Sequence, residues 1–277
     1  MLRIQVMQLL RTPSKAFAFC FATSGFYLLW LFVSPFVYFR AKSKRRWRNF
    51  IFRNWAKTIV KVLGIKVQTN TIVPATPFFL VSNHLSYLDI VVFASQMDCV
   101  FIAKREVKRW PVFGLLSRSM DTIFIDRTRA QDIPRVNALI AETLQSGQNI
   151  VVFPEGTSTA GAEVLPFRPS LLEPAAKGNF PVAYASIRYR TPPDETPAHL
   201  SVCWWGAMTL LPHLFGVFRL PAIEATLTFG AKTLQGNDRK ELAKQLHDAV
   251  TTIFTPSTVT EVACNTETQP SILPLKS

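Results

Sequence analysis

A run of 24 residues without a charged side chain, from Ala16 to Phe39, restricts the fold of this chain more than any other feature. A helix of this length can cross a hydrocarbon core of about 30 Å. A cleavable signal peptide is the alternative, but the run is long for one, and basic residues follow it instead of a small-residue cleavage site. We therefore expect residues 1–39 to form a membrane-embedded anchor, either a spanning helix or a hairpin.

The net charge of +13 is concentrated beside this run. Thirteen Lys and Arg residues and no Asp or Glu precede Asp89, whereas the remaining 18 basic residues are matched by 18 acidic ones. A basic block directly after an apolar helix is typical of a cytoplasmic juxtamembrane patch that faces anionic lipid. A solvated charge run or a nuclear signal is the alternative. Binding to nucleic acid is disfavoured, because the rest of the chain is balanced in charge.

Residues 40–64 continue this block as a basic amphipathic helix that suits a membrane surface. Basic side chains recur every four residues on one face: Arg53, Lys57 and Lys61. Apolar side chains lie on the other face: Phe52, Trp55, Ile59 and Leu63. Gly64 supplies a C-terminal stop. Packing of this helix on the chain's own domain is equally compatible with the pattern.

Beyond this helix, short apolar runs alternate with helical patterns. The expected strands are 66–69, 78–82, 100–103, 122–126, 150–153, 182–188, 200–204 and 225–229. The expected helices are 88–96, 111–119, 133–146 and 238–254. This alternation predicts an α/β domain over residues 40–254, with a mixed sheet covered by helices. The polar residues 255–277 are expected to form a flexible tail.

A second apolar run, residues 203–221, is interrupted by Gly206, Pro212 and Gly216. We expect it to line an acyl-binding or membrane-facing surface, with core packing as the alternative. The four His and four Cys residues show no metal-ligand spacing, so we expect no protein-bound metal. Scattered cysteines also favour a reducing compartment.

The stretch "SNHLSYLDIV", Ser82 to Val91, contains the first candidate for catalysis. Ser86 and Asp89 have the spacing of a helix capping box, which is the structural interpretation of this stretch. His84 and Asp89 would diverge on one continuous helix, but a turn before Ser86 lets His84 fold back. A carboxylate that fixes one imidazole nitrogen leaves the other free to accept a proton, so the pair can act as a general base.

Two further stretches are candidates for binding an anion. "TIFIDRT" places Arg127 at the end of an apolar strand, where its guanidinium can bind phosphate or form a surface salt bridge. "NIVVFPEGTSTAG" leads a strand into Glu155, Gly156 and Thr157. There the glycine lets the backbone approach an anion and the hydroxyl can bind one. Taken alone, each stretch is an ordinary strand-to-loop turn.

Together, these blocks in this order resemble the glycerolipid acyltransferase family, which includes the 1-acylglycerol-3-phosphate O-acyltransferases. "NHLSYLD", "IFIDR" and "FPEGTS" match its blocks, and "NFPVAYAS" is a weaker fourth. The resemblance implies that His84 and Asp89 are the catalytic dyad. It also implies that Arg127, Glu155, Gly156 and Thr157 hold the acceptor's phosphate. One departure is Arg168, followed by Pro169, where the family often has a Phe-Lys-x-Gly element.

The function that this resemblance implies is transfer of a fatty acyl group from acyl-CoA or acyl carrier protein to the hydroxyl of a lysolipid. 1-Acylglycerol 3-phosphate would then give phosphatidic acid, with no metal or redox cofactor, on the cytoplasmic face of a membrane. Lyso-ornithine lipid, another lysophospholipid or glycerol 3-phosphate are alternative acceptors. A non-enzymatic protein that binds anionic lipid would explain the basic N-terminus but not three ordered polar blocks.

Overall fold

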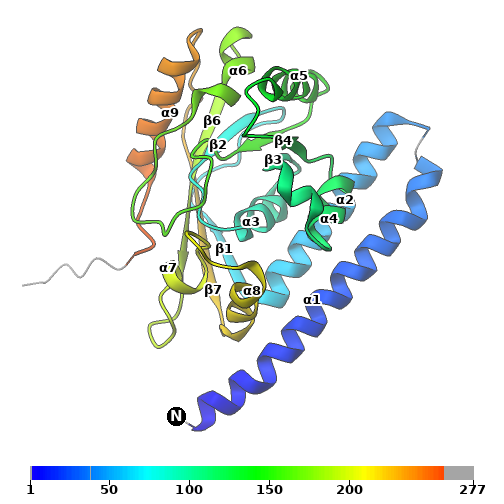
Figure 1. Cartoon of the computed structure of the whole chain (residues 1–277), viewed down its shortest axis with the longest axis vertical. Coiled ribbons are helices and arrows are strands. Elements are labelled where there is room, and N and C mark those ends of the chain that lie inside the picture. Colours follow the sequence, from blue (N-terminus) through cyan, green and yellow to red (C-terminus); the bar gives the residue numbers. More distant parts are fainter. Residues whose placement is uncertain (1, 38, 259–277) are drawn as a thin grey trace, which may run out of the picture.

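The computed structural model describes residues 2–37 and 39–258, and a seven-stranded sheet lies at its centre (Figure 1). The strand order is β1-β7-β6-β2-β5-β3-β4. The strands are β1 (Ile65–Thr69), β2 (Phe79–Ser82), β3 (Val100–Lys104), β4 (Ile123–Ile125), β5 (Ile150–Val152), β6 (Val182–Arg190) and β7 (Ile223–Phe229). Only β6 and β7 pair antiparallel. The predicted mixed sheet is therefore confirmed.

Helices cover both faces of this sheet (Figure 1). They are α1 (Leu2–Val37), α2 (Ala41–Leu63), α3 (Leu88–Gln96), α4 (Phe113–Ser119), α5 (Asp132–Gln145), α6 (Glu173–Lys177), α7 (Ala198–Ser201), α8 (Leu210–Arg219) and α9 (Arg239–Ile253). Two short 3₁₀ helices, η1 (Arg105–Arg109) and η2 (Pro169–Leu171), complete the set. One core joins the sheet to α2, α3 and α8, and a second joins it to α5, α6 and α9.

Strand β2 shows why the sheet needs helices on both sides. Phe79 and Val81 point into the core under α5 and α9, and Leu80 points into the core under α2 and α3. All of these side chains are fully buried. A parallel strand buried on both faces reads as a continuous apolar run instead of an alternating one, which is how this strand was predicted.

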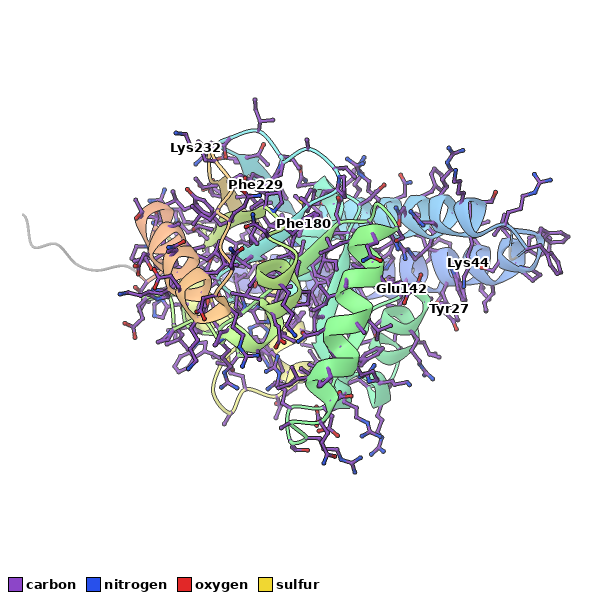
Figure 2. The ribbon with its side chains drawn as sticks, turned by 90° about the horizontal axis from the view of Figure 1, so that it is seen from above. Tyr27, Lys44, Glu142, Phe180, Phe229 and Lys232 are labelled. Carbon is purple, nitrogen blue, oxygen red and sulfur yellow. The ribbon has the colours of Figure 1, made fainter. Side chains whose placement is uncertain are left out.

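The N-terminal part is a helical hairpin made of α1 and α2. Figure 2 shows the two helices side by side, reaching beyond the sheet at the end that carries Tyr27 and Lys44. Gly64 adopts φ 74° and ends α2, as predicted. The apolar face of α2, including Trp55 and Ile59, is buried against α1 and α3. This helix therefore packs on its own domain.

The apolar run of residues 16–37 forms a single helix, not a hairpin within itself. From Leu10 to Val37 the helix is long and apolar enough to cross a membrane. Its inner side is fixed to the domain. Lys15 Nζ donates to the carbonyl oxygens of Leu63 and Leu220 at 2.6 and 2.8 Å, and the Trp55 indole donates to Thr23 at 3.2 Å.

Three sequence-based expectations differ from the structure. Residues 200–204 do not form a strand: Leu200 and Ser201 belong to α7, and the buried Val202 and Cys203 are followed by Trp204, whose backbone N donates to Leu85 O at 2.8 Å in the loop before α3. Residues 210–219 within the second apolar run form α8. The expected tail begins later than residue 255, because Ser257 is buried and bonded to Gly161, and residues 259–277 lie outside the described part.

Candidate active site

The polar turn between β2 and α3 brings His84 and Asp89 together. His84 lies in the loop and Asp89 lies in the first turn of α3, so the five-residue spacing does not separate them. His84 Nδ1 and Asp89 Oδ2 are 2.7 Å apart. Since a carboxylate oxygen only accepts, Nδ1 carries the proton and donates it. The predicted contact between these two side chains is confirmed.

Asp89 is fully buried, and its carboxylate organises the whole turn. Oδ2 also accepts the backbone N–H groups of Leu85 at 2.7 Å and Ser86 at 3.1 Å. The bond to Ser86 N is one half of the predicted capping box. The other half is absent, because Ser86 Oγ is buried without a partner among the described residues. Asp89, not Ser86, therefore holds the start of α3.

Tyr189 is a partner of Asp89 that the sequence did not reveal. Its phenol oxygen donates to Asp89 Oδ1 at 2.8 Å, from the opposite side of the carboxylate to His84. Tyr189 is fully buried, and burial raises its pKa, with the charge of Asp89 adding to the effect. Its own backbone N–H is held by Ser257 Oγ at 3.1 Å. The His84–Asp89 pair is therefore the outer end of a series of contacts that runs from Ser257 through Tyr189 to Asp89 and His84.

The Glu155 carboxylate is directed into the protein and away from any solvent-borne ligand. Oε1 accepts the backbone N–H of His84 at 2.8 Å, and Oε2 accepts that of Leu165 at 3.2 Å. Burial raises the pKa of Glu155 to about 8. The expectation that this side chain binds the acceptor's phosphate does not fit these contacts, since both of its oxygens are engaged by backbone N–H groups. Glu155 instead fixes the loop that carries His84.

Two arginines lie beside the next residue, Gly156, and a lysine lies close enough to both to interact with their charge. Arg127 Nη1 donates to Gly156 O, and the Arg168 side chain lies 3.1 Å from where a Cβ on Gly156 would be. Desolvation lowers the pKa of Lys104 and of Arg127, the charge of Arg168 adds to both shifts, and the charge of Glu106 opposes them. We call Lys104, Arg127 and Arg168 the basic cluster. The sequence predicted Arg127; it flagged Arg168 only as a departure and gave no signal for Lys104.

Gly156 is needed where these side chains meet. Its φ of 78° favours glycine, and any Cβ there would meet Arg168. Thr157, the next residue, is exposed. The loop then returns to the dyad, because Thr159 N donates to His84 O at 3.0 Å. One loop therefore joins the basic cluster to the His84 turn. A phosphate site made by Arg127, Gly156 and Thr157, as expected from the sequence, would need such a connection to lie near the dyad.

The outer nitrogen of His84 faces the accessible side. The imidazole stacks on Phe153 with ring centroids 4.3 Å apart, and the side chain keeps 21% of its surface exposed. Among the described residues, Nε2 has no hydrogen-bond partner. A ring whose Nδ1 is held by a carboxylate and whose Nε2 is free can accept a proton from a bound hydroxyl. The described residues contain no group of three His, Cys, Asp or Glu that could hold a metal ion.

Aromatic side chains line the other side of the turn. The Tyr87 hydroxyl lies 3.0 Å from His213 Nδ1, and His213 Nε2 lies 3.1 Å from the Cys203 carbonyl oxygen. The carbonyl can only accept, so Nε2 donates and Nδ1 accepts from Tyr87. Desolvation lowers the pKa of His213, which favours this neutral ring. The second apolar run is thereby fastened to the turn that contains His84.

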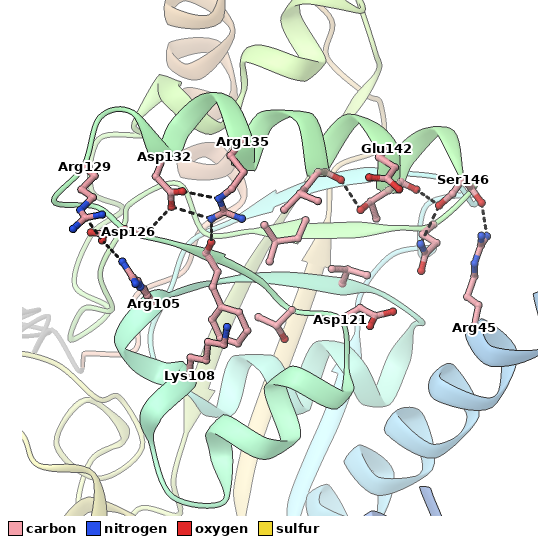
Figure 3. A pocket seen from close by; sticks show the side chains of 17 residues that line it. Arg45, Arg105, Lys108, Asp121, Asp126, Arg129, Asp132, Arg135, Glu142 and Ser146 are labelled. Carbon is pink, nitrogen blue, oxygen red and sulfur yellow. Dashed lines mark hydrogen bonds and ion pairs between the residues drawn. The ribbon is translucent and has the colours of Figure 1, made fainter. Parts of the chain in front are cut away.

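A separate cavity of about 780 Å³ lies at the β4 edge of the sheet (Figure 3). Two of its acidic side chains form ion pairs with arginines that also line it: Asp126 pairs with Arg105, and Asp132 pairs with Arg135. Neither the dyad, Glu155 nor the basic cluster lines it. This cavity is therefore distinct from the His84 site.

Comparison with known proteins agrees with this geometry. Residues 64–188, which contain the dyad, Arg127 and Glu155, match the family model named Acyltransferase. The crystal structure of PlsC from Thermotoga maritima, a 1-acyl-sn-glycerophosphate acyltransferase, superposes with a TM-score of 0.66 at 23% identity. That match covers 90% of this chain and 95% of PlsC, and so shows a shared fold.

Two curated relatives carry different acceptor names. The lyso-ornithine lipid O-acyltransferase of Brucella abortus is 32% identical over 229 residues, covering 78% of this chain and 86% of the relative. The 1-acyl-sn-glycerol-3-phosphate acyltransferase of Neisseria meningitidis is 29% identical, covering 73% and 80%. The chain belongs to the acyltransferase family and is an acyl-transferring enzyme.

Proposed function

We propose that this enzyme transfers a fatty acyl group from a thioester donor to the free hydroxyl of 1-acylglycerol 3-phosphate, giving phosphatidic acid. The observation that carries the proposal is the His84–Asp89 pair, 2.7 Å apart, with Nε2 of His84 free and accessible. The donor is acyl-CoA or acyl carrier protein, and neither requires a metal or redox cofactor.

The chemistry needs one base and one leaving thiolate. His84 Nε2 takes the proton of the acceptor hydroxyl as that oxygen attacks the thioester carbonyl carbon. Asp89 holds Nδ1–H and stabilises the imidazolium that forms. The tetrahedral intermediate collapses by breaking the carbon–sulfur bond, and the proton on Nε2 neutralises the departing thiolate. The products are one new ester and one free thiol.

The basic cluster supports a phosphate-bearing acceptor. Arg127 and Arg168 lie beside Gly156, on the loop whose Glu155 holds the backbone of His84, and Lys104 and the acidic Glu106 lie within electrostatic reach of Arg127. A phosphate monoester carries up to two negative charges and several acceptor oxygens, which suits guanidinium forks. Thr157 contributes an exposed hydroxyl at the same loop. In this proposal Glu155 holds the loop and does not touch phosphate.

Lyso-ornithine lipid is the second candidate acceptor. The observation in its favour is the resemblance to enzymes of that name, at 32% identity in Brucella abortus and 31% in Pseudomonas aeruginosa. Its head group carries both a carboxylate and an ammonium group, so a cluster of three cations complements it less fully than it complements a phosphate.

We propose a membrane location with the sheet domain on the cytoplasmic face. Helix α1 supplies an apolar stretch from Leu10 to Val37, and the lysolipid acceptor resides in a membrane. The exposed basic residues at the start of α2 follow α1 directly and suit an anionic, cytoplasmic lipid surface: Arg40, Lys42, Lys44 and Arg46. Arg45 and Arg48 instead bind the sheet domain, at Ser146 O and Asp121.

The test is a panel of acceptors with one labelled acyl-CoA, using the purified full-length chain. 1-Acylglycerol 3-phosphate, lyso-ornithine lipid, lysophosphatidylethanolamine and glycerol 3-phosphate are compared at equal concentration, each also with His84→Ala. The proposal expects the highest kcat/KM with 1-acylglycerol 3-phosphate and a rate lower by about 10²–10⁴ from the variant. A higher kcat/KM with lyso-ornithine lipid would make that lipid the proposed acceptor, and the proposed chemistry at His84 would stand unchanged. No transfer to any lysolipid contradicts the function.

A further inference from the structure

The exposed hydrophobic side chains have an uneven distribution. Every large hydrophobic side chain that is exposed in the described part lies in one of three segments, residues 1–88, 107–120 and 196–223. Outside α1, six of them lie on α4, on the residue that precedes it, and on the α7–α8 segment (residues 198–219): Val112, Leu115, Leu200, Trp205, Leu211 and Phe215. We call these six side chains the apolar patch.

The same three segments contain no acidic residue. Asp and Glu are absent from residues 1–88, from 107–120 and from 196–223, although the whole chain has 18 of them. Basic residues flank the apolar patch: Lys108, Arg109, Arg118 and Arg219. A water-facing surface has no reason to exclude carboxylates alone. A surface in contact with anionic lipid does, because carboxylates near it are repelled and cations are attracted.

Helix α8 is apolar around most of its circumference. Leu214, Val217 and Phe218 are buried in the core, while Leu211 and Phe215 on the outer side are 62% and 48% exposed. A short helix that is apolar on both sides is usually covered on both sides. In the described part of the chain, no element covers the outer side of α8.

The apolar patch is continuous with the membrane candidate α1. Phe218 of α8 contacts Phe19 of α1, with ring centroids 5.7 Å apart, and Arg11 Nη1 donates to Arg219 O at 3.1 Å. On α4, Leu116 lies against Tyr27 of α1 around a small cavity. In Figure 1, α4 and α8 both lie on the α1 side of the sheet, and α9 lies on the opposite side.

The apolar patch also borders the catalytic turn. Tyr87, three residues after His84, lies between the two halves of the patch; its ring is 6.5 Å from Phe113 of α4 and 5.5 Å from His213 of α8. Trp204 N is bonded to Leu85 O in the same place.

We propose that the outer faces of α4 and of the α7–α8 segment contact the lipid bilayer alongside α1, so that the turn carrying His84 opens at the membrane surface. The contact with lipid stands independently of which acceptor is used; its effect on the rate of acyl transfer rests on the proposed function.

Fluorescence with quencher lipids tests the contact directly. Cys20→Ser and Cys264→Ser are first introduced into the full-length chain, so that only the buried Cys99 and Cys203 remain. One cysteine is then introduced as Phe215→Cys, Leu115→Cys, Phe17→Cys on α1 or Gln245→Cys on α9, and labelled with an environment-sensitive dye. The proteins are reconstituted into phosphatidylethanolamine–phosphatidylglycerol vesicles with and without doxyl-labelled lipid.

Labels at positions 215 and 115 are expected to be quenched at least threefold more than the label at position 245, and about as strongly as the label at position 17. Equal quenching at positions 215 and 245 overturns the proposal, whatever happens on α1. A blue-shifted emission at position 215 without lipid quenching means that a protein partner or a second copy covers the patch, and also overturns it.

A paired activity assay separates this inference from the proposed function. Leu211→Glu with Phe215→Glu is compared with Gln245→Glu and Thr252→Glu, which add the same charge to α9. The α8 variant is expected to lose at least fivefold in rate on vesicle-borne lysolipid and to keep its rate on lysolipid in detergent micelles. Loss of rate in micelles as well contradicts the membrane contact. If the unmodified chain transfers no acyl group, the proposed function is wrong. The lipid contact is still tested, because the quenching measurement does not depend on activity.

Discussion

Tyr189 donates a hydrogen bond to Oδ1 of Asp89 at 2.8 Å, while His84 Nδ1 engages Oδ2 of the same carboxylate at 2.7 Å. The buried carboxylate is thus held from both sides and cannot rotate without breaking a bond. The orientation of the His84 ring therefore depends on a residue of β6, 100 positions beyond Asp89.

Tyr189→Phe removes this bond and keeps the ring that fills the core. A hydrogen bond to a charged group contributes about 1.5–3 kcal/mol, so we expect kcat to fall by roughly tenfold or more with little change in KM. The pH profile of kcat should shift as well, because the orientation of the Asp89 carboxylate sets the basicity of His84. Tyr184→Phe on the same strand is the matched control. Equal effects of the two substitutions would argue against a positioning role for Tyr189.

Glu155 gives the stability of the fold a predictable pH dependence. Burial raises the pKa of Glu155 from 4.5 to about 8, so the folded chain retains a proton that the unfolded chain releases in this window. Unfolding then becomes easier as pH rises from about 4.5 to about 8, by up to about 1.4 kcal/mol per pH unit. Below pH 4.5 Glu155 is protonated in both the folded and the unfolded chain, so its full contribution to stability is present.

Glu155→Gln should flatten this dependence, which chemical denaturation in detergent at several pH values would measure. Its single oxygen can serve His84 N or Leu165 N but not both, so activity should also fall. Glu163→Gln, an exposed carboxyl in the following loop, is the control. If both variants keep the original slope, the pH dependence does not come from Glu155.

Arg168→Ala tests the basic cluster. Loss of one charge-assisted contact to phosphate should raise the KM for 1-acylglycerol 3-phosphate by roughly tenfold and leave the KM for the acyl donor unchanged. Arg129→Ala removes the same charge from the loop after β4, where Arg129 pairs with Asp126, and should change little. An unchanged acceptor KM in Arg168→Ala would exclude this side chain from the head-group site.

Gly156→Ala and Gly147→Ala form a matched pair. Both glycines have φ near 75°, at 78° and 75°, so alanine strains the backbone equally, by about 1–2 kcal/mol. A Cβ at position 147 meets nothing within 4 Å, whereas one at position 156 meets Arg168. We expect similar losses of thermal stability but a fall in kcat/KM only for Gly156→Ala. Parallel losses of activity would mean that the Gly156 loop is sensitive to strain alone.

Most of the sheet could be predicted from the sequence because its strands are short apolar runs with clear ends. Residues 150–152 and 182–190 were found within two positions. The strand predicted at residues 200–204 was wrong, because an apolar run that packs against a loop has the same composition as one that pairs in a sheet. The helix α8 was missed because Gly216 and Pro212 lie inside it, where their low helix propensity is overridden by tertiary packing.

The candidate site divides in the same way. The contact between His84 and Asp89 followed from a turn that local sequence specifies. The bond from His84 N to Glu155 and the role of Tyr189 could not be predicted locally, because the residues in contact are 71 and 100 positions apart in the chain. The absence of acidic residues before Asp89 now has a physical basis, since the same exclusion recurs wherever apolar side chains are exposed.

The central claim is that His84 removes the proton from the acceptor hydroxyl. Its most direct test is the single-turnover rate of acyl transfer by His84→Ala, at saturating donor and lysolipid, beside His199→Ala as the matched control. Loss of a general base lowers rates by about 10²–10⁴. We predict a loss in this range for His84→Ala and a near-normal rate for His199→Ala. A wild-type rate in His84→Ala would contradict the mechanism.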